Sequence, residues 1–162
     1  MIQPSSIMKS IWGKSMKTIG FIDYYLDEWH ANNYPQLIKE ASGGEFEVTC
    51  AYAMKDSPLK GGMTTDEWCE KYQIKRCGTI EEVIEKCDCL LVLSPDNCEM
   101  HEELCKLPLC SGKLTYVDKT FAPDKETAER IFAVAQEHST PCYSTSALRF
   151  ASEYKDTDYA GT

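Results

Sequence analysis

Short apolar runs alternate with amphipathic stretches along most of the chain. The runs are rich in Val, Ile, Leu, Phe and Tyr, which is typical of strands that are buried on both faces. Six of them are predicted to be strands: 17–23, 46–54, 74–77, 89–94, 114–118 and 141–144.

The stretches between these runs carry apolar residues at helical spacing. Tyr34, Leu37, Ile38 and Ala41 fall at i, i+3, i+4 and i+7, so they predict a helix that begins after a polar turn over 23–33. Two later helices are also predicted, one over 99–107 and one that carries Ala128, Ile131, Phe132 and Ala135 on one face.

Helix starts and stops can be placed from local residue types. Thr64 and Thr79 are each followed three residues later by a Glu, which is the spacing of a capping box, so each predicts a helix start. Gly43-Gly44 and Pro108 are expected to end helices, and Pro123-Asp124 to start one.

Strand and helix thus alternate about six times, which predicts an α/β chain. The expected architecture is a three-layer Rossmann fold, with a mostly parallel sheet of about six strands and helices on both faces. The sequence has 162 residues, 43% of them hydrophobic, which is enough for one domain over 17–154. Residues 1–16 are expected to form a flexible leader and 155–162 a tail.

The composition indicates which binding partners and which cellular compartment to expect. The net charge of −9 makes nucleic acid an unexpected partner, because phosphate binding needs a basic surface. The longest apolar stretch, 89–93, is too short to span a membrane. The odd number of nine cysteines, many of them in apolar runs, predicts free thiols and a cytoplasmic protein. Homo-oligomer formation is left open.

Ligands of parallel α/β sheets bind beyond the carboxyl ends of the strands, where the strand order switches. The candidate binding residues therefore follow the predicted strands: Asp23, Tyr24, Tyr25, His30, Lys55, Ser94, Pro95, Asn97 and Asp118. Lys119 directly follows a buried strand and is the candidate catalytic residue, as a proton donor or substrate anchor. The alternative for Lys119 is a surface loop lysine.

Three segments resemble one family. Residues 89–101 (CLLVLSPDNCEMH), 117–122 (VDKTFA) and 124–149 are similar in order and spacing to parts of the Gfo/Idh/MocA family, which includes glucose–fructose oxidoreductase and inositol dehydrogenase. In the family's Glu-Lys-Pro segment, Asp118 stands for the Glu, Lys119 matches the Lys and Thr120 replaces the Pro.

This resemblance covers residue 17 to about 154 and implies the family's N-terminal Rossmann domain. It implies an oxidoreductase that acts on a CH–OH group of a sugar or polyol with NAD or NADP, and it places Lys119 near nicotinamide and substrate. The family's second α/β domain would begin near Thr162 and is absent from the sequence. The chain is therefore expected to be half an enzyme, either a fragment or a truncated relative.

The first turn departs from the family's Gly-rich pattern. Asp23, Tyr25 and Glu28 take the three glycine positions, so bulk and negative charge stand where pyrophosphate binds. Weak binding of NAD or NADP is therefore expected. A second hypothesis follows, in which the chain is a non-catalytic relative that serves as a binding or assembly module. Lys55 either faces the 2′-phosphate of NADP or is a solvated turn lysine.

Other polar residues have competing interpretations. Cys98, His101 and Cys105 share one helical face, but no Cys-x-x-Cys pair accompanies them, so a core stripe is expected and no metal site. His30 either donates to a ligand hydroxyl or has a local structural role. Arg149, near the last predicted strand, either holds an anionic group or lies in solvent.

Overall fold

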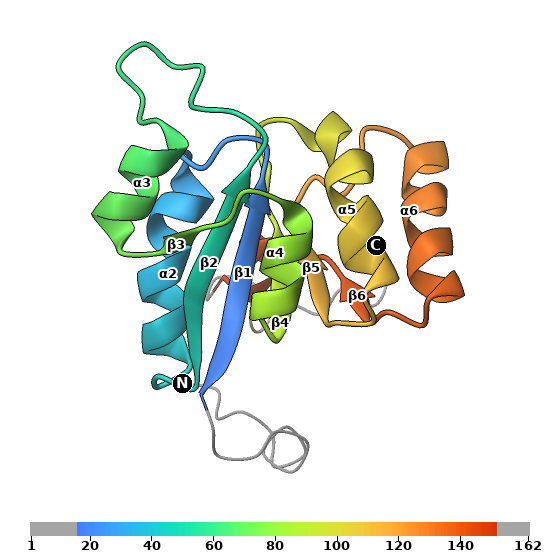
Figure 1. Cartoon of the computed structure of the whole chain (residues 1–162). Helices are drawn as coiled ribbons and strands as arrows, with labels where there is room; N and C mark the ends of the chain where they lie inside the picture. The colour runs from blue at the N-terminus through green and yellow to red at the C-terminus, as the bar shows by residue number, and fades with distance from the viewer. Residues whose placement is uncertain (1–15, 152–162) are drawn as a thin grey trace.

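The structure, a computed structural model, describes residues 16–151. A six-stranded sheet in the order β3-β2-β1-β4-β5-β6 forms its centre, and every strand pair is parallel (Figure 1). The strands are β1 (Lys17–Asp23), β2 (Phe46–Ala53), β3 (Lys75–Arg76), β4 (Cys89–Val92), β5 (Thr115–Val117) and β6 (Cys142–Tyr143). The predicted Rossmann fold is confirmed. The expected tail and all but the last residue of the expected leader lie outside the described residues.

Helices cover both faces of this sheet (Figure 1). The helices are α2 (Trp29–Ala41), α3 (Thr65–Tyr72), α4 (Ile80–Lys86), α5 (His101–Cys110) and α6 (Lys125–Glu137), with short 3₁₀ turns η1 (Cys98–Met100) and η2 (Ala147–Phe150). Residues of α2 and α3 pack in one hydrophobic cluster, and residues of α4, α5 and α6 pack in the other. The sheet therefore separates two cores.

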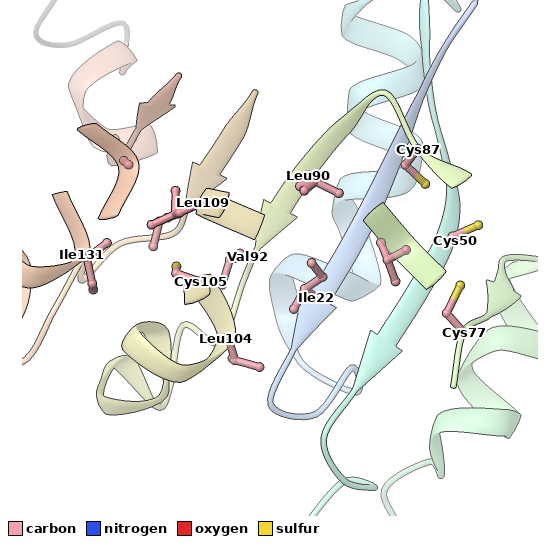
Figure 2. Close-up of a cluster of buried hydrophobic side chains, with 13 residues drawn as sticks. Ile22, Cys50, Cys77, Cys87, Leu90, Val92, Leu104, Cys105, Leu109 and Ile131 are labelled. Atoms are coloured by element: carbon pink, nitrogen blue, oxygen red, sulfur yellow. The ribbon is translucent and has the colours of Figure 1, made fainter. Parts of the chain in front are cut away.

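The core on the side of α4, α5 and α6 extends across the whole sheet. Cys50, Cys77 and Cys87 lie at one end of it and Leu109 and Ile131 at the other (Figure 2). All nine cysteines of the chain are free thiols, and these three are almost completely buried. Burial raises the pKa of the Cys77 thiol to about 11, so this thiol behaves as a small apolar side chain.

Gly20 sets how closely α4 approaches the sheet. A Cβ at this position would overlap Cγ1 of Val83 and would lie 3.1 Å from Sγ of Cys87. Val83 is fully buried, so the helix has no room to move outward without opening the core. The missing side chain of Gly20 thus holds α4 against β1.

Two helix boundaries differ from the sequence-based expectation. Helix α2 begins at Trp29, inside the predicted polar turn, because the Glu28 side chain caps it. Helix α5 continues through Pro108 to Cys110. Pro108 has no N–H to donate, but both Pro108 and Leu109 are buried, so packing holds this last turn against the core.

Capping and core packing also differ in detail. The capping box at Thr64 is confirmed. Thr79 caps α4, but the carboxylate of Glu82 accepts from the backbone of Gly78 instead of completing the box. Phe132, on the predicted apolar face of α6, is 50% exposed and stacks on Phe121, with ring centroids 4.5 Å apart.

No helix in residues 16–151 is both long enough and apolar enough to cross a membrane.

Candidate functional site

The sheet brings the predicted site residues from three strands to one edge. Asp23 ends β1, and the amide of Leu93 just after β4 donates to the carbonyl of Ile22 over 2.9 Å. The amide of Asp118, directly after β5, donates to the carbonyl of Val92 over 2.9 Å. Because β1 and β4 are neighbours at the switch in strand order, this edge is where ligands of such sheets bind.

Tyr25 bridges the turns that follow β1 and β4. Its side chain is buried, and its hydroxyl lies 3.1 Å from Oδ2 of Asp96, to which it donates. Burial, followed by the hydrogen bond to Asp96, raises the pKa of Tyr25 to about 12. The ring and its neutral hydroxyl therefore span the switch point.

Glu28 occupies the N-terminus of α2 with its own carboxylate. One oxygen accepts from the amide of His30 over 2.6 Å, and the other accepts from the amide of Ala31. Unpaired amides at a helix N-terminus are the usual donors to a phosphate. In this turn two of these donors already bind an anionic group of the chain itself.

Asp23 is a buried carboxyl beneath this cap. Its Oδ1 accepts from the amide of Tyr24 over 2.7 Å, whereas Oδ2 is buried and has no hydrogen-bond partner among the described residues. Burial first, and the charge of Glu28 second, raise the pKa of Asp23 well above the ordinary value, although backbone amides oppose the shift. Asp23 therefore tends to hold a proton.

His30 connects the β1–α2 turn with the end of β5. Its Nδ1 lies 3.3 Å from Oε2 of Glu28 and 3.4 Å from Oδ2 of Asp118. Asp118 is fully buried, and its Oδ1 accepts from the hydroxyl of Tyr116 over 2.9 Å and from the amide of Lys119 over 2.8 Å. The carboxylates of Glu28, which caps α2, and Asp118, which follows β5, thus lie close to the same ring nitrogen, which makes no hydrogen bond with either of them.

Two lysines predicted to bind ligand lie in different surroundings. Lys119 is half-buried beside Asp118, and its ammonium has no ion pair or hydrogen bond with the described part of the chain. The ammonium of Lys55 lies 4.1 Å from the ring centre of Tyr24. This cation–π contact explains the positions of the Lys55 and Tyr24 side chains without requiring a bound ligand.

The turn after β4 is closed by internal hydrogen bonds. Ser94 has a left-handed backbone, with φ of 64°, and its hydroxyl donates to the carbonyl of Asn97 over 3.0 Å. The side-chain amide of Asn97 donates to Glu99 over 2.8 Å. Ser94, Pro95 and Asn97 lie at the expected edge, but the polar groups of Ser94 and Asn97 are already engaged.

Sequence reasoning missed three residues of this edge. Tyr116 holds Asp118, and Tyr34 packs its ring 5.0 Å from that of His30. His101 is fully buried, with Nδ1 2.9 Å from the carbonyl of Phe121 and Nε2 against the carbonyl of Leu93. The signal for Tyr116 was its position two residues before Asp118, because alternate strand residues share a face.

His101, Cys98 and Cys105 do not form a common site. His101 ties the end of β4 to the loop after β5, while Cys105 is buried in the core. In the described residues, no group of three His, Cys, Asp or Glu side chains is arranged to hold a metal ion. Two surface hollows, one between α5 and α6 and one beside β6, are lined by none of the predicted site residues.

A dinucleotide does not fit the β1–α2 turn as it stands. The two amides that would face pyrophosphate donate to Glu28, and Tyr25 fills the gap to the next turn. A pyrophosphate would also meet the carboxylate of Glu28 at close range, which is strongly unfavourable. The turn would have to rearrange for the phosphates to bind.

Comparison with known proteins identifies similar folds. No family model and no curated protein matches the sequence. A dehydrogenase, MviM, from Clostridium difficile is 24% identical with a TM-score of 0.65 over 86% of this chain and 42% of its own. Biliverdin reductase from Synechocystis sp. PCC 6803, solved with biliverdin and NADP+, is 9% identical with a TM-score of 0.65 over 85% of this chain and 40% of its own.

A third similar structure is a 3-ketoreductase, KijD10, from Actinomadura kijaniata, solved with NADP and TDP-benzene. It is 20% identical with a TM-score of 0.59 over 81% of this chain and 37% of its own. The chain thus spans about two fifths of the length of these structures. The expected resemblance is confirmed at the level of the fold: this is the Rossmann fold found in dehydrogenases and reductases.

Proposed function

We propose that the chain is the Rossmann domain of an oxidoreductase that acts on a CH–OH group or carbonyl of a sugar or polyol. The similar structures support the reaction class, since MviM is a dehydrogenase, and biliverdin reductase and the 3-ketoreductase KijD10 were both solved with NADP. The cytoplasm is the proposed location, because nine free thiols suit a reducing compartment.

Lys119 carries this proposal. It directly follows the buried Asp118 at the carboxyl edge of β5, and its backbone is fixed by the 2.8 Å hydrogen bond to that carboxylate. The side chain of this half-buried lysine suits an anchor or proton donor for a substrate oxygen. In this proposal Lys119 faces the substrate, and NAD or NADP binds weakly because of the self-capped turn.

One observation favours a second function. The carboxylate of Glu28 takes the donors at the N-terminus of α2. This is the arrangement expected of a non-catalytic binding or assembly module that has lost its dinucleotide site. Under that alternative, Lys119 has no nicotinamide and no reacting substrate to contact.

Amide NMR spectra of the ¹⁵N-labelled chain distinguish the two functions. NAD, NADH, NADP and NADPH are each added to about 10 mM, well above the expected Kd of about 1 mM, which corresponds to roughly −4 kcal/mol. The oxidoreductase proposal predicts saturable shifts at residues 24–30, 94–97 and 118–119. Absence of saturable shifts at these residues with all four dinucleotides would exclude it in favour of the non-catalytic module.

A further inference from the structure

His30 is held between two carboxylates that come from different parts of the sheet edge. Glu28 precedes it in the same turn, whereas Asp118 follows β5, 88 positions further along the sequence. Nδ1 of His30 lies 3.3 Å from Glu28 and 3.4 Å from Asp118. Both carboxylates therefore face the same ring nitrogen.

One oxygen of the Asp118 carboxylate is held by hydrogen bonds that do not involve His30. Its Oδ1 accepts from the hydroxyl of Tyr116 and the amide of Lys119, at 2.9 and 2.8 Å. Its Oδ2 is buried and has no hydrogen-bond partner among the described residues. Its neighbour at 3.4 Å, Nδ1 of His30, is likewise buried without a hydrogen-bond partner among the described residues, so two unpaired polar atoms face each other here.

The Glu28 side chain is held in place by backbone hydrogen bonds. Both of its oxygens accept from backbone amides of α2. Its Oε2 lies 3.3 Å from Nδ1 of His30 without a hydrogen bond between them, close enough to stabilise positive charge on the ring. The buried Asp23, whose pKa is raised in part by Glu28, completes the set of acidic groups at this turn.

Aromatic rings fix the orientation of the imidazole. The ring of Tyr34 lies 5.0 Å from it at 71°, and the ring of Trp29 lies 5.3 Å from it at 83°. Nδ1 is buried, while the side chain of His30 keeps 13% of its exposure. The opposite edge of the ring, which carries Nε2, is therefore the edge that can reach solvent or a ligand.

We infer that His30 is an acid–base group whose tautomer is set by Asp118 and Glu28. With its proton on Nδ1, the ring presents the lone pair of Nε2 at the edge that also carries Lys119. A substrate hydroxyl gives its proton to Nε2, so the O–H bond breaks, an N–H bond forms and the electron pair stays on oxygen. The two carboxylates stabilise the resulting imidazolium.

The substrate in this step rests on the proposed function. The tautomer of His30, and its dependence on Asp118 and Glu28, does not rest on it. A hydroxyl-bearing ligand is the class that this edge suits, because a phosphate would meet Glu28 and the buried Asp118. Glu28 and Asp118 are positioning residues here, since they act through the imidazole.

The chain offers its own controls, because it has three histidines in different environments. His101 is fully buried between two carbonyls, and His138 is exposed at the end of α6. Two-bond ¹H–¹⁵N spectra of the full chain report the tautomer of each ring at a pH where it is neutral. Single His→Gln variants at 30 and 138 assign the signals.

The expected result is a Nδ1–H tautomer for His30 and a shift towards Nε2–H in Asp118→Asn. Reaction with diethyl pyrocarbonate, which acylates an unprotonated imidazole nitrogen, should modify His30 at Nε2 while His101 stays unmodified. Asp118→Asn should slow the reaction of His30 by at least about tenfold, well below the ~10⁴-fold that a wrong tautomer costs a serine protease. The reaction of His138 should not change.

A Nε2–H tautomer for His30 in the unmodified chain would overturn the inference. So would a His30 as unreactive as His101, because Nε2 would then not be accessible. Neither readout requires dinucleotide, so failure of the inference about His30 is distinguishable from failure of the proposed oxidoreductase function.

Discussion

Three side chains in the β1–α2 turn use the space and the donors that would otherwise bind an anion. Glu28 accepts from the first amides of α2, Tyr25 reaches Asp96 across the switch point, and Asp23 lies buried beneath them. A carboxylate and a phosphate at about 4–6 Å in a partly wet site repel by roughly 1–4 kcal/mol. The bulky and acidic residues of this turn thus give the edge a chemistry that disfavours anions, within an ordinary Rossmann fold.

The stability of the chain should depend on pH through Asp23. Its folded pKa is raised by burial and by Glu28, so the proton is held more tightly in the folded than in the unfolded state. Its contribution to stability is complete below the unfolded value of ~3.9 and is lost as the pH rises through the folded pKa.

Urea unfolding of the wild type and Asp23→Asn tests this expectation. Because the amide mimics the protonated acid, the variant should gain stability over the wild type as the pH rises above about 4, and the gain should level off above the folded pKa. A stability difference that does not change with pH would show that Asp23 has the same pKa in both states.

His101 should matter more for stability than for any site. Its nitrogens face the buried carbonyls of Leu93 and Phe121, so His101→Leu leaves both oxygens without their side-chain partner. Loss of these contacts should lower the free energy of unfolding by about 2–4 kcal/mol. The exposed His138 is the control, and His138→Leu should change it by less than about 0.5 kcal/mol. Equal losses of stability in the two variants would contradict the role of His101 in linking the end of β4 to the loop after β5.

At the scale of elements, close packing of α4 on the sheet depends on Gly20. Gly20→Ala would push a methyl group into Val83 and Cys87 and should lower the free energy of unfolding by about 1–3 kcal/mol. Gly78→Ala is the matched control, since its added Cβ would have Oε2 of Glu82, 3.9 Å away, as its nearest neighbour. Thermal or urea unfolding that shows similar losses for both variants would refute this packing account.

The elements were predictable to the extent that their signals were local. Hydrophobic runs placed all six strands, and the residue pattern at Thr64 placed α3. The start of α2 was missed because its cap is a Glu, which is an uncommon N-cap residue. The continuation of α5 past Pro108 depends on tertiary packing, since Pro108 and Leu109 are both buried.

The site was only partly predictable. Alternation of strand and helix was sufficient to bring Asp23, Ser94 and Asp118 to one edge. The contact of His30 with Asp118 could not be predicted, because it joins residues that are remote in sequence through the orientation of one ring. The stacking of Lys55 on Tyr24 likewise depends on the path of two adjacent loops.

At the scale of the whole molecule, the net charge of −9 opposes an anionic ligand. Salt screens such long-range repulsion, with a Debye length that falls from about 30 Å at 0.01 M to about 8 Å at 0.15 M. Binding of NADPH should therefore tighten modestly as salt is raised over this range, contrary to a site that relies on basic residues. Weakening of NADPH binding with salt would indicate a basic contact at the site.

Calorimetric titration with NAD, NADH, NADP and NADPH tests most directly whether Glu28 blocks the phosphate site. The wild type should bind each with Kd of about 1 mM or weaker, and Glu28→Ser, which keeps a capping residue but removes the charge, should bind at least about tenfold more tightly. Asp124→Ser makes a similar change at the N-terminus of α6, where Asp124 accepts from Thr127 over 2.7 Å, and should leave Kd unchanged. A wild-type Kd below about 50 μM for any of the four, or a Glu28→Ser variant that binds no more tightly than Asp124→Ser, would contradict the account.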